Sequence, residues 1–84
     1  MHSKAYISKD DAKNLEQRIA SKDIEIPFEI DYIYYFKNQP LACIFASVNQ
    51  DELAIFLEKN KYPALKIEEA KRYSIDSDES SIDR

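Results

Sequence analysis

Apolar residues occupy every even position between Asp23 and Phe36, which makes this stretch the most regular pattern in the chain. Its odd positions start polar or acidic and become apolar at Ile33 and Tyr35. Because side chains alternate between the two faces of a strand, the pattern predicts a β-strand over this stretch with its even-numbered residues buried. Pro27 has no N–H to donate, so it indicates either an edge strand or a bulge.

A second run, Leu41–Val48, is almost wholly apolar. A short run without alternation is typical of a strand that is covered on both faces, so we expect this strand in the middle of the sheet. The residues between the two runs supply a turn, in which Asn38 tolerates a positive φ. The two strands are therefore expected to form an antiparallel hairpin.

A two-residue loop at Asn38 and Gln39 fixes the register of this hairpin. The expected pairs are Phe36 with Leu41, Tyr34 with Cys43, and Tyr32 with Phe45. We expect these side chains on the buried face, which leaves the opposite face exposed yet apolar, as in an interaction surface. That predicted interface consists of Tyr6, Ile33, Tyr35, Ala42, Ile44 and Ala46. The alternatives are a register that differs by one residue, or a C-terminal segment that folds over this face.

Two helices are predicted from their N-terminal signals. Ser8 is placed as an N-cap with Asp11 three residues later, and Asn49 begins a second helix with the same spacing. Apolar residues follow each cap at helical spacing, so the first helix is expected to run to about Ser21. A proline prevents the second helix from continuing.

The first and last strands are less regular. Lys4–Ile7 is short and apolar enough for a strand. Ala64–Ile75 has high helix propensity, yet its apolar residues alternate. We expect Ala64–Glu69 to return as a strand parallel to the one before the second helix, because the hairpin needs a wider sheet. A helix over Ala64–Ile75 is the alternative, and it would cover the second face of the sheet.

The expected order is then strand, helix, strand, strand, helix, strand. This order resembles the ferredoxin-like βαββαβ fold, which implies an α+β two-layer sandwich with an antiparallel sheet and both helices on one face. The resemblance lies in the order of elements alone and carries no functional residue, since that fold hosts many activities. We expect a disordered N-terminus over 1–3, a single domain over 4–75 and a disordered acidic tail over 76–84.

Composition limits the classes of function. The chain has 84 residues, a net charge of −4, one cysteine and no glycine. The lack of glycine excludes glycine-rich phosphate loops, and the negative charge argues against nucleic-acid binding. Cys43 stands alone in an apolar run, so we expect a buried, inert thiol and a cytoplasmic location. No apolar run is long enough to span a membrane, and the N-terminus has no signal-peptide pattern.

Four acidic residues precede and enter the first half of the long strand pattern: Asp23, Glu25, Glu29 and Asp31. They form a candidate docking strip for a basic partner. A metal site is disfavoured, because alternate strand positions lie about 6.6 Å apart. The simpler interpretation is a solvated outer face, whose charges also discourage association between sheet edges.

The aromatic residues Tyr32, Tyr34, Tyr35 and Phe36 resemble in kind the base-stacking platforms of RNA-binding sheets. Most of them have the parity assigned to the buried face, so core packing is the interpretation we adopt. A nucleophilic role for Cys43 needs a base nearby, and the only histidine, His2, lies next to the N-terminus.

These patterns favour a non-enzymatic protein-interaction or regulatory domain, such as an inhibitor, an antitoxin or an immunity protein. We expect it to be a homodimer through the open sheet face, because two-fold dimers dominate soluble oligomers. The alternative is a regulatory domain that binds a small ligand at the dimer seam. We predict no catalytic residues, no cofactor and no metal site.

Overall fold

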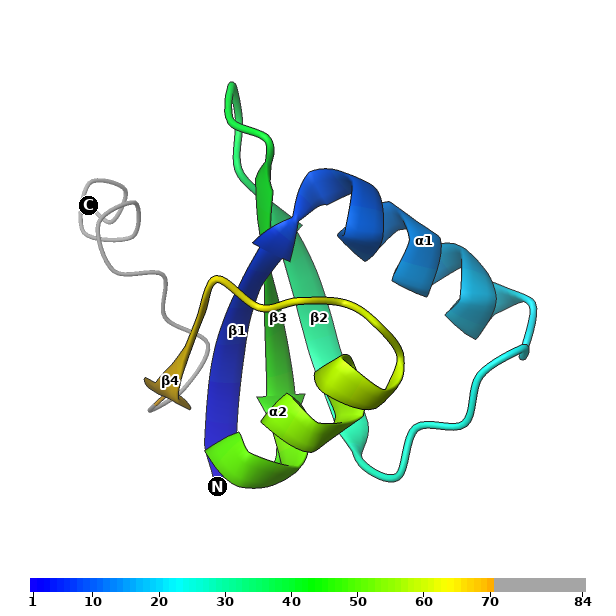
Figure 1. The fold of residues 1–84 in the computed structure, drawn as a ribbon, viewed down its shortest axis with the longest axis vertical. Coiled ribbons are helices and arrows are strands. Elements are labelled where there is room, and N and C mark those ends of the chain that lie inside the picture. The colour runs from blue at the N-terminus through cyan, green and yellow to red at the C-terminus, as the bar shows by residue number, and fades with distance from the viewer. Residues whose placement is uncertain (71–84) are drawn as a thin grey trace.

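The computed structural model describes residues 1–70. Its elements in chain order are β1 (His2–Ser8), α1 (Lys9–Ala20), β2 (Glu29–Tyr35), β3 (Leu41–Ser47), α2 (Gln50–Lys59) and β4 (Lys66–Ala70), as Figure 1 shows. The four strands form one sheet in the order β2-β3-β1-β4, and each neighbouring pair is antiparallel. The predicted α+β class with an antiparallel sheet and two helices is confirmed.

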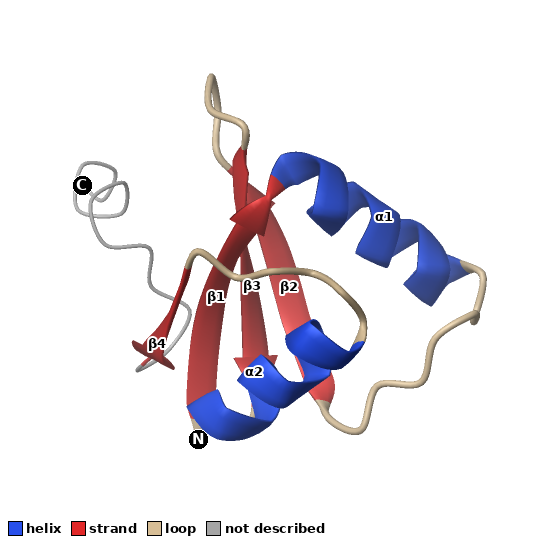
Figure 2. Ribbon diagram, viewed as in Figure 1, coloured by secondary structure: helices blue, strands red, loops and turns tan. Residues whose placement is uncertain are grey.

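Both helices lie on one side of the sheet (Figure 2). They share a single core with the residues of the sheet that point toward them. We call this side the helix face and the other side the open face. Within residues 1–70, no helix lies on the open face.

The helices begin where their capping signals predict. The Ser8 hydroxyl accepts a hydrogen bond from the Asp11 N–H at 3.1 Å, and the Asn49 side chain accepts one from the Glu52 N–H at 2.8 Å. Each bond satisfies an N–H that has no partner within the helix. Acidic side chains in both first turns also suit the positive end of the helix dipole.

Both helices end without glycine. Lys22 and Lys61 follow the two C-caps with φ of 57° and 62°. After α2, the Tyr62 N–H bonds to the Leu57 carbonyl and the Lys61 N–H to the Glu58 carbonyl, which is the Schellman pattern. Asn38 adopts the third positive φ, 63°, in the β2–β3 turn, as expected from its tolerance of this region.

The helix face combines small residues on the sheet with large residues on the helices. Ala5, Ala42 and Ala46 are fully buried there beside Ile7 and Ile44. The helices contribute Ala12, Leu15, Leu53, Phe56 and Leu57 to the same core. Alanines let the helix backbones approach the sheet closely, so the larger helix side chains fill the space between the layers.

The long alternating pattern is only partly a strand. Residues 21–28 form a connection, and β2 begins at Glu29. Ile30 pairs with Ala46 and Tyr32 pairs with Phe45, so Asp31 is an extra residue in β2 without an opposite partner. Such a β-bulge shifts the alternation by one residue.

The bulge explains why the predicted faces are wrong. The hairpin register is confirmed, because Tyr32 lies opposite Phe45 and Tyr34 opposite Cys43. The even residues before the bulge do pack toward the helices, as predicted, but those after it point to the open face. Ile33 and Tyr35 pack instead against the core beneath the helices. A prediction that continues the same alternation past Asp31 therefore assigns the later residues of β2 to the wrong faces.

The ends of the domain also differ from the prediction. β1 begins at His2 rather than Lys4, and Ser3 is buried, where its hydroxyl donates to the Val48 carbonyl at 2.6 Å. This bond anchors the segment predicted to be disordered. Residues 66–70 form a strand, as we preferred over a helix, and it runs parallel to β3 because both are antiparallel to β1. The end of the Ala64–Ile75 segment and the acidic tail over 76–84 lie outside the described residues.

Candidate functional site

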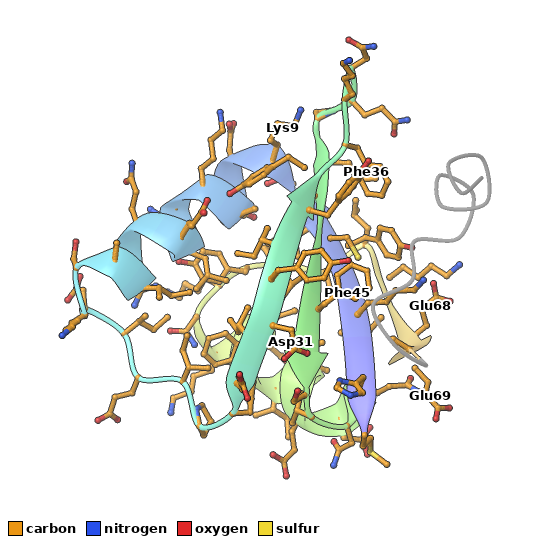
Figure 3. The ribbon with its side chains drawn as sticks, turned by 180° about the vertical axis from the view of Figure 1, so that it is seen from behind. Lys9, Asp31, Phe36, Phe45, Glu68 and Glu69 are labelled. Carbon is orange, nitrogen blue, oxygen red and sulfur yellow. The ribbon has the colours of Figure 1, made fainter. Side chains whose placement is uncertain are left out.

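The open face carries a group of five aromatic side chains that we call the ring cluster: Tyr6, Tyr32, Tyr34, Phe36 and Phe45. Figure 3 looks onto this face, with Phe45 near its centre and Phe36 near the β2–β3 turn. Phe45 and Cys43 are buried beneath the other rings, although no helix within residues 1–70 covers them. The rings themselves therefore act as the outer layer of a second, shallow core.

The rings pack in geometries that aromatic pairs prefer. Tyr32 stacks on Phe45 with centroids 4.7 Å apart and planes 14° apart. Tyr6 stacks with Phe36 at 6.1 Å, and Tyr34 meets Phe36 edge-on at 4.9 Å. Tyr32 nevertheless keeps 36% of its surface exposed, so the cluster presents aromatic carbon to the solvent.

The strand registers arrange the open face into two rows that cross all four strands. The first row contains Tyr32, Phe45, Lys4 and Glu68, and the second contains Tyr34, Cys43, Tyr6 and Lys66. Both rows are aromatic at the β2 edge and charged at the β4 edge. The rows differ at β4, where the first ends in a carboxylate and the second in an ammonium group.

The charged ends of the rows interact within the chain. The Lys4 side chain is only 4% exposed; its Nζ lies 3.9 Å from Glu68 Oε2 and 6.0 Å from the Tyr6 ring centroid. A lysine buried this deeply requires such partners. Lys66 Nζ lies 3.8 Å from Glu68 Oε1, and its side chain is 66% exposed. The Lys66 ammonium group is thus available to interact outside the chain as well.

Tyr6 and Cys43 are uncharged members of the second row. Burial raises the pKa of Tyr6 above its ordinary value, and the nearby Cys43 adds to the rise. The Tyr6 phenol therefore stays protonated at neutral pH. Cys43 is a buried thiol, in agreement with its predicted place in an apolar strand. The second row is consequently uncharged from β2 to β1.

A polar cluster lies at the end of the open face, beside the bulge. The Ser47 hydroxyl contacts both carboxylate oxygens of Asp31, at 2.9 and 3.1 Å. His2 Nδ1 lies 3.4 Å from Asp31 Oδ2 and 3.4 Å from Ser47 Oγ. In a serine nucleophile relay the imidazole stands between the hydroxyl and the carboxylate. Here the hydroxyl reaches the carboxylate directly, so these contacts tie β2, β3 and β1 together.

The predicted interface lies mostly on the wrong side of the sheet. Ala42, Ile44 and Ala46 are fully buried under the helices, and Ile33 and Tyr35 pack against the same core. Of the predicted interface residues only Tyr6 belongs to the open face. The residues that the prediction missed as surface groups are Tyr32, Tyr34, Phe36, Lys66 and Glu68.

A signal for the correct face was present in β1. In this strand Ala5 and Ile7 alternate with Lys4 and Tyr6, so the apolar side of the strand is unambiguous. Because Tyr6 pairs with Cys43, the polar side of β1 fixes which side of β3 is open. Tyrosine hydroxyls also favour a face that water can reach.

The four predicted docking carboxylates do not form one strip. Asp23 and Glu25 are exposed in the connection before β2, and Glu29 is exposed at its first residue. The Asp31 side chain is only 8% exposed and is engaged by Ser47 on the open face. The bulge and the non-strand conformation of 21–28 remove the regular spacing that the strip required.

Asp23 and Glu25 instead border a groove between the end of α1, the connection before β2, and α2. Its volume is about 560 Å³. The apolar part is formed by Ile24, Pro27, Ile55 and Phe56, and the charged rim by Arg18, Asp23, Glu25, Glu52 and Lys59, with Asn60 at one end. The rim carries both signs of charge, so it does not select a strongly basic partner.

Residues 1–70 contain no group of three His, Cys, Asp or Glu side chains close enough to hold a metal ion. No helix in the same range is long and apolar enough to cross a membrane. No protein-family model, curated protein or solved structure matches this chain. The open face and the groove are therefore the features from which a function must be argued.

Proposed function

We propose that the protein is a non-enzymatic interaction domain that binds protein through the open face of its sheet. The observation that carries this proposal is the ring cluster, which leaves aromatic carbon of Tyr32 exposed on a sheet face above the buried Phe45. A solvent-facing antiparallel sheet is ordinarily polar, and contiguous apolar patches mark sites of association.

The chemistry of the cluster suits a protein partner. Tyrosine and phenylalanine are enriched in the centres of protein interfaces, because they supply a large contact area with few rotatable bonds. The aromatic centre is bordered by Lys66, Glu68 and the Asp31 cluster, which gives the apolar centre and polar rim typical of interfaces. This arrangement supports binding of a protein on the open face.

A side-chain footprint tests the proposal. Hydroxyl-radical oxidation of Tyr32 and Tyr34 is measured by mass spectrometry in two samples: the purified protein at nanomolar concentration, and a nuclease-treated extract of cells that make it. We expect several-fold less oxidation of both tyrosines in the extract, because a protein covers the open face there. Ile55, which is 64% exposed on α2, and Tyr62, which is buried, are internal references that should not change.

Two outcomes would contradict the proposal. Equal oxidation in both samples would mean that nothing covers the rings in the extract. Protection that is present before nuclease treatment and disappears after it would identify a nucleic acid on the rings instead of a protein.

We also infer that the architecture is ferredoxin-like. The order of elements and the strand order β2-β3-β1-β4 with antiparallel neighbours support this assignment. The fold hosts many unrelated activities, so it does not narrow the function. The lone buried thiol suits a reducing compartment, and on that basis we place the protein in the cytoplasm.

Small-ligand binding is the second candidate, and the groove beside α2 is the observation that favours it. Its volume of about 560 Å³ lies within the range of ligand sites. The test is native mass spectrometry of the protein purified from its own host, with Ile55→Trp to fill the groove. If a ligand binds in this groove, the wild type should carry an added mass that Ile55→Trp lacks. If the wild type has only the mass of the polypeptide, this candidate function is wrong.

A further inference from the structure

We propose that the partner on the open face is a second copy of this chain, related by a two-fold axis that crosses the strands midway between the two rows. This inference rests on the proposed function, since it specifies the occupant of the same face. The two rows of the open face are chemically complementary to each other, which binding to an unrelated protein would not require.

The axis follows from the strand registers. A two-fold axis that lies between two stacked sheets and crosses their strands sets each strand over its own copy, in the opposite direction. When it passes between the rows, the first row of one protomer lies over the second row of its partner. The facing pairs are Tyr32 with the partner's Tyr34, Phe45 with the partner's Cys43, Lys4 with the partner's Tyr6, and Glu68 with the partner's Lys66.

The two pairs whose side chains reach the surface are favourable in kind. Glu68 meets the ammonium group of the partner's Lys66, and Tyr32 meets the ring of the partner's Tyr34. Phe45, Cys43 and Lys4 are buried within their own protomer and lie beneath these contacts. Because the interface is isologous, every one of these contacts occurs twice. The same axis thus brings rings together at β2 and opposite charges together at β4, and this complementarity is what favours a copy of this chain as the occupant.

The other face-to-face arrangement is less favourable. An axis parallel to the strands would set β2 over the partner's β4, with Tyr34 over the partner's Lys66 and Tyr32 over the partner's Glu68. The exposed ends of the Lys66 and Glu68 side chains would then lose water to aromatic carbon, and no opposite charge would face them across the interface. The strand-crossing axis avoids this loss.

The size of the face sets the expected strength. Four strands of five to seven residues give a face of roughly 400 Å² in projection, from strand spacings of about 4.8 Å and rises of about 3.3 Å. Standard interfaces bury about 800 Å² per partner, so this contact is at the small end even after allowing for the rough surface of side chains. We expect a dimer with a dissociation constant in the micromolar range.

A mixing experiment with opposite charge reversals tests the axis. Lys66→Glu places glutamate opposite the partner's Glu68, and Glu68→Lys places lysine opposite the partner's Lys66. Each variant alone should dimerise about tenfold more weakly than the wild type, because two contacts change from attractive to repulsive. In an equimolar mixture both contacts of the heterodimer become attractive again, so dimerisation should recover by about tenfold in sedimentation velocity.

The matched control is the pair Lys59→Glu and Glu58→Lys, which makes the same charge changes on exposed positions of α2. Mixing these two variants should leave dimerisation unchanged. Circular dichroism of each protein checks that every variant is folded, and the recovery is measured between the same folded chains, so a small loss of stability does not imitate it.

The outcomes separate this inference from the proposed function. A wild type that stays monomeric up to millimolar concentration overturns the second copy, whereas protection of Tyr32 in the nuclease-treated extract would still support a different protein on the face. If the wild type dimerises but mixing Lys66→Glu with Glu68→Lys does not restore dimerisation, the strand-crossing axis is wrong. Recovery that occurs equally with the α2 control pair also overturns it, because the attraction is then not specific to the face.

Discussion

The two faces of this sheet contain similar amounts of apolar material but differ in its shape and in what covers it. The helix face has alanines at Ala5, Ala42 and Ala46, and two helices fill the space above them. The open face has large rings instead, and the rings cover Phe45 and Cys43 themselves. Burial in the sheet is thus achieved by a second layer on one side and by bulky side chains on the other.

The difference shows which apolar residues stabilise the monomer and which remain for association. Side chains beneath a helix lose nearly all contact with water, so their loss leaves a cavity in the fold. Rings at the surface of the open face, such as Tyr32, keep part of their surface toward solvent, and a partner can bury them further. The predictions below separate these two roles.

The largest effect is expected on the helix face. Ile44→Ala should lower the free energy of unfolding by about 3 kcal/mol, because Ile44 is fully buried and its neighbours can close the cavity only in part. Tyr32→Ala, on the other face, should cost roughly 1 kcal/mol, mainly its stacking on Phe45. Urea unfolding of both variants at concentrations below dimerisation measures the difference. Equal losses would refute the assignment of the two faces.

The next effect concerns association. Tyr32→Glu should leave a folded monomer and weaken dimerisation by about 30-fold or more, since it places a charge at the centre of an aromatic contact. Ile55→Glu, at a more exposed apolar residue on α2, is the matched control and should leave the mass unchanged. Light scattering over a concentration series gives both results. A dimer that tolerates the first change but not the second would place the interface on the helices.

A smaller effect is expected at the polar end of the open face. Asp31→Ala removes the acceptor of the Ser47 hydroxyl and the carboxylate beside His2, and should lower the free energy of unfolding by about 1 to 2 kcal/mol. Ser47→Ala should cost less, because Asp31 keeps its neighbour His2. The measurement is again urea unfolding. If Asp31→Ala were neutral, the cluster would not be what joins the three strand ends.

The last effect is absent at neutral pH and is confined to the alkaline range. Burial, and the hydrogen bond that the Tyr35 hydroxyl donates to Glu16, raise the pKa of Tyr35 from 10.0 to about 12. Because this pKa is higher in the folded state, the associated stability is fully present below pH 10 and is lost as the pH rises toward 12. Tyr35→Phe should reduce the loss of stability between pH 10 and pH 12, and its absorbance titration near 295 nm should lack the latest step. An unchanged titration would mean that Tyr35 ionises normally.

Much of the architecture follows from local signals in the sequence. Ser8 and Asn49 mark the helix starts because their side chains cap free N–H groups, and this chemistry depends on neighbours within four residues. Asn38 marks the hairpin turn for a similar reason, and the turn fixes which residues lie opposite each other. These features need no knowledge of the rest of the fold.

The assignment of the faces did not follow, for two physical reasons. From Tyr32 to Tyr35 both sides of β2 are apolar, so hydrophobicity alone does not distinguish them. The bulge at Asp31 also lacks the glycine that marks many bulges, and the carboxylate is held by Ser47 and His2, which are distant in the sequence. The sequence of β1 does distinguish its two sides, and because Tyr6 pairs with Cys43, its polar side identifies the open side of β3.

The bulge at Asp31 determines where β2 can change length during evolution. Ile30 and Tyr32 pair with consecutive residues of β3, so loss of Asp31 would leave a regular strand with both faces unchanged and would remove only the carboxylate beside Ser47 and His2. A residue lost or gained between Tyr32 and the hairpin turn would instead exchange the rings with Ile33 and Tyr35. A residue lost or gained in the connection 21–28 would alter only a surface segment and the groove beside it. Related chains should therefore vary in length before Glu29 or at the bulge, and keep a constant number of residues from Tyr32 to the hairpin turn.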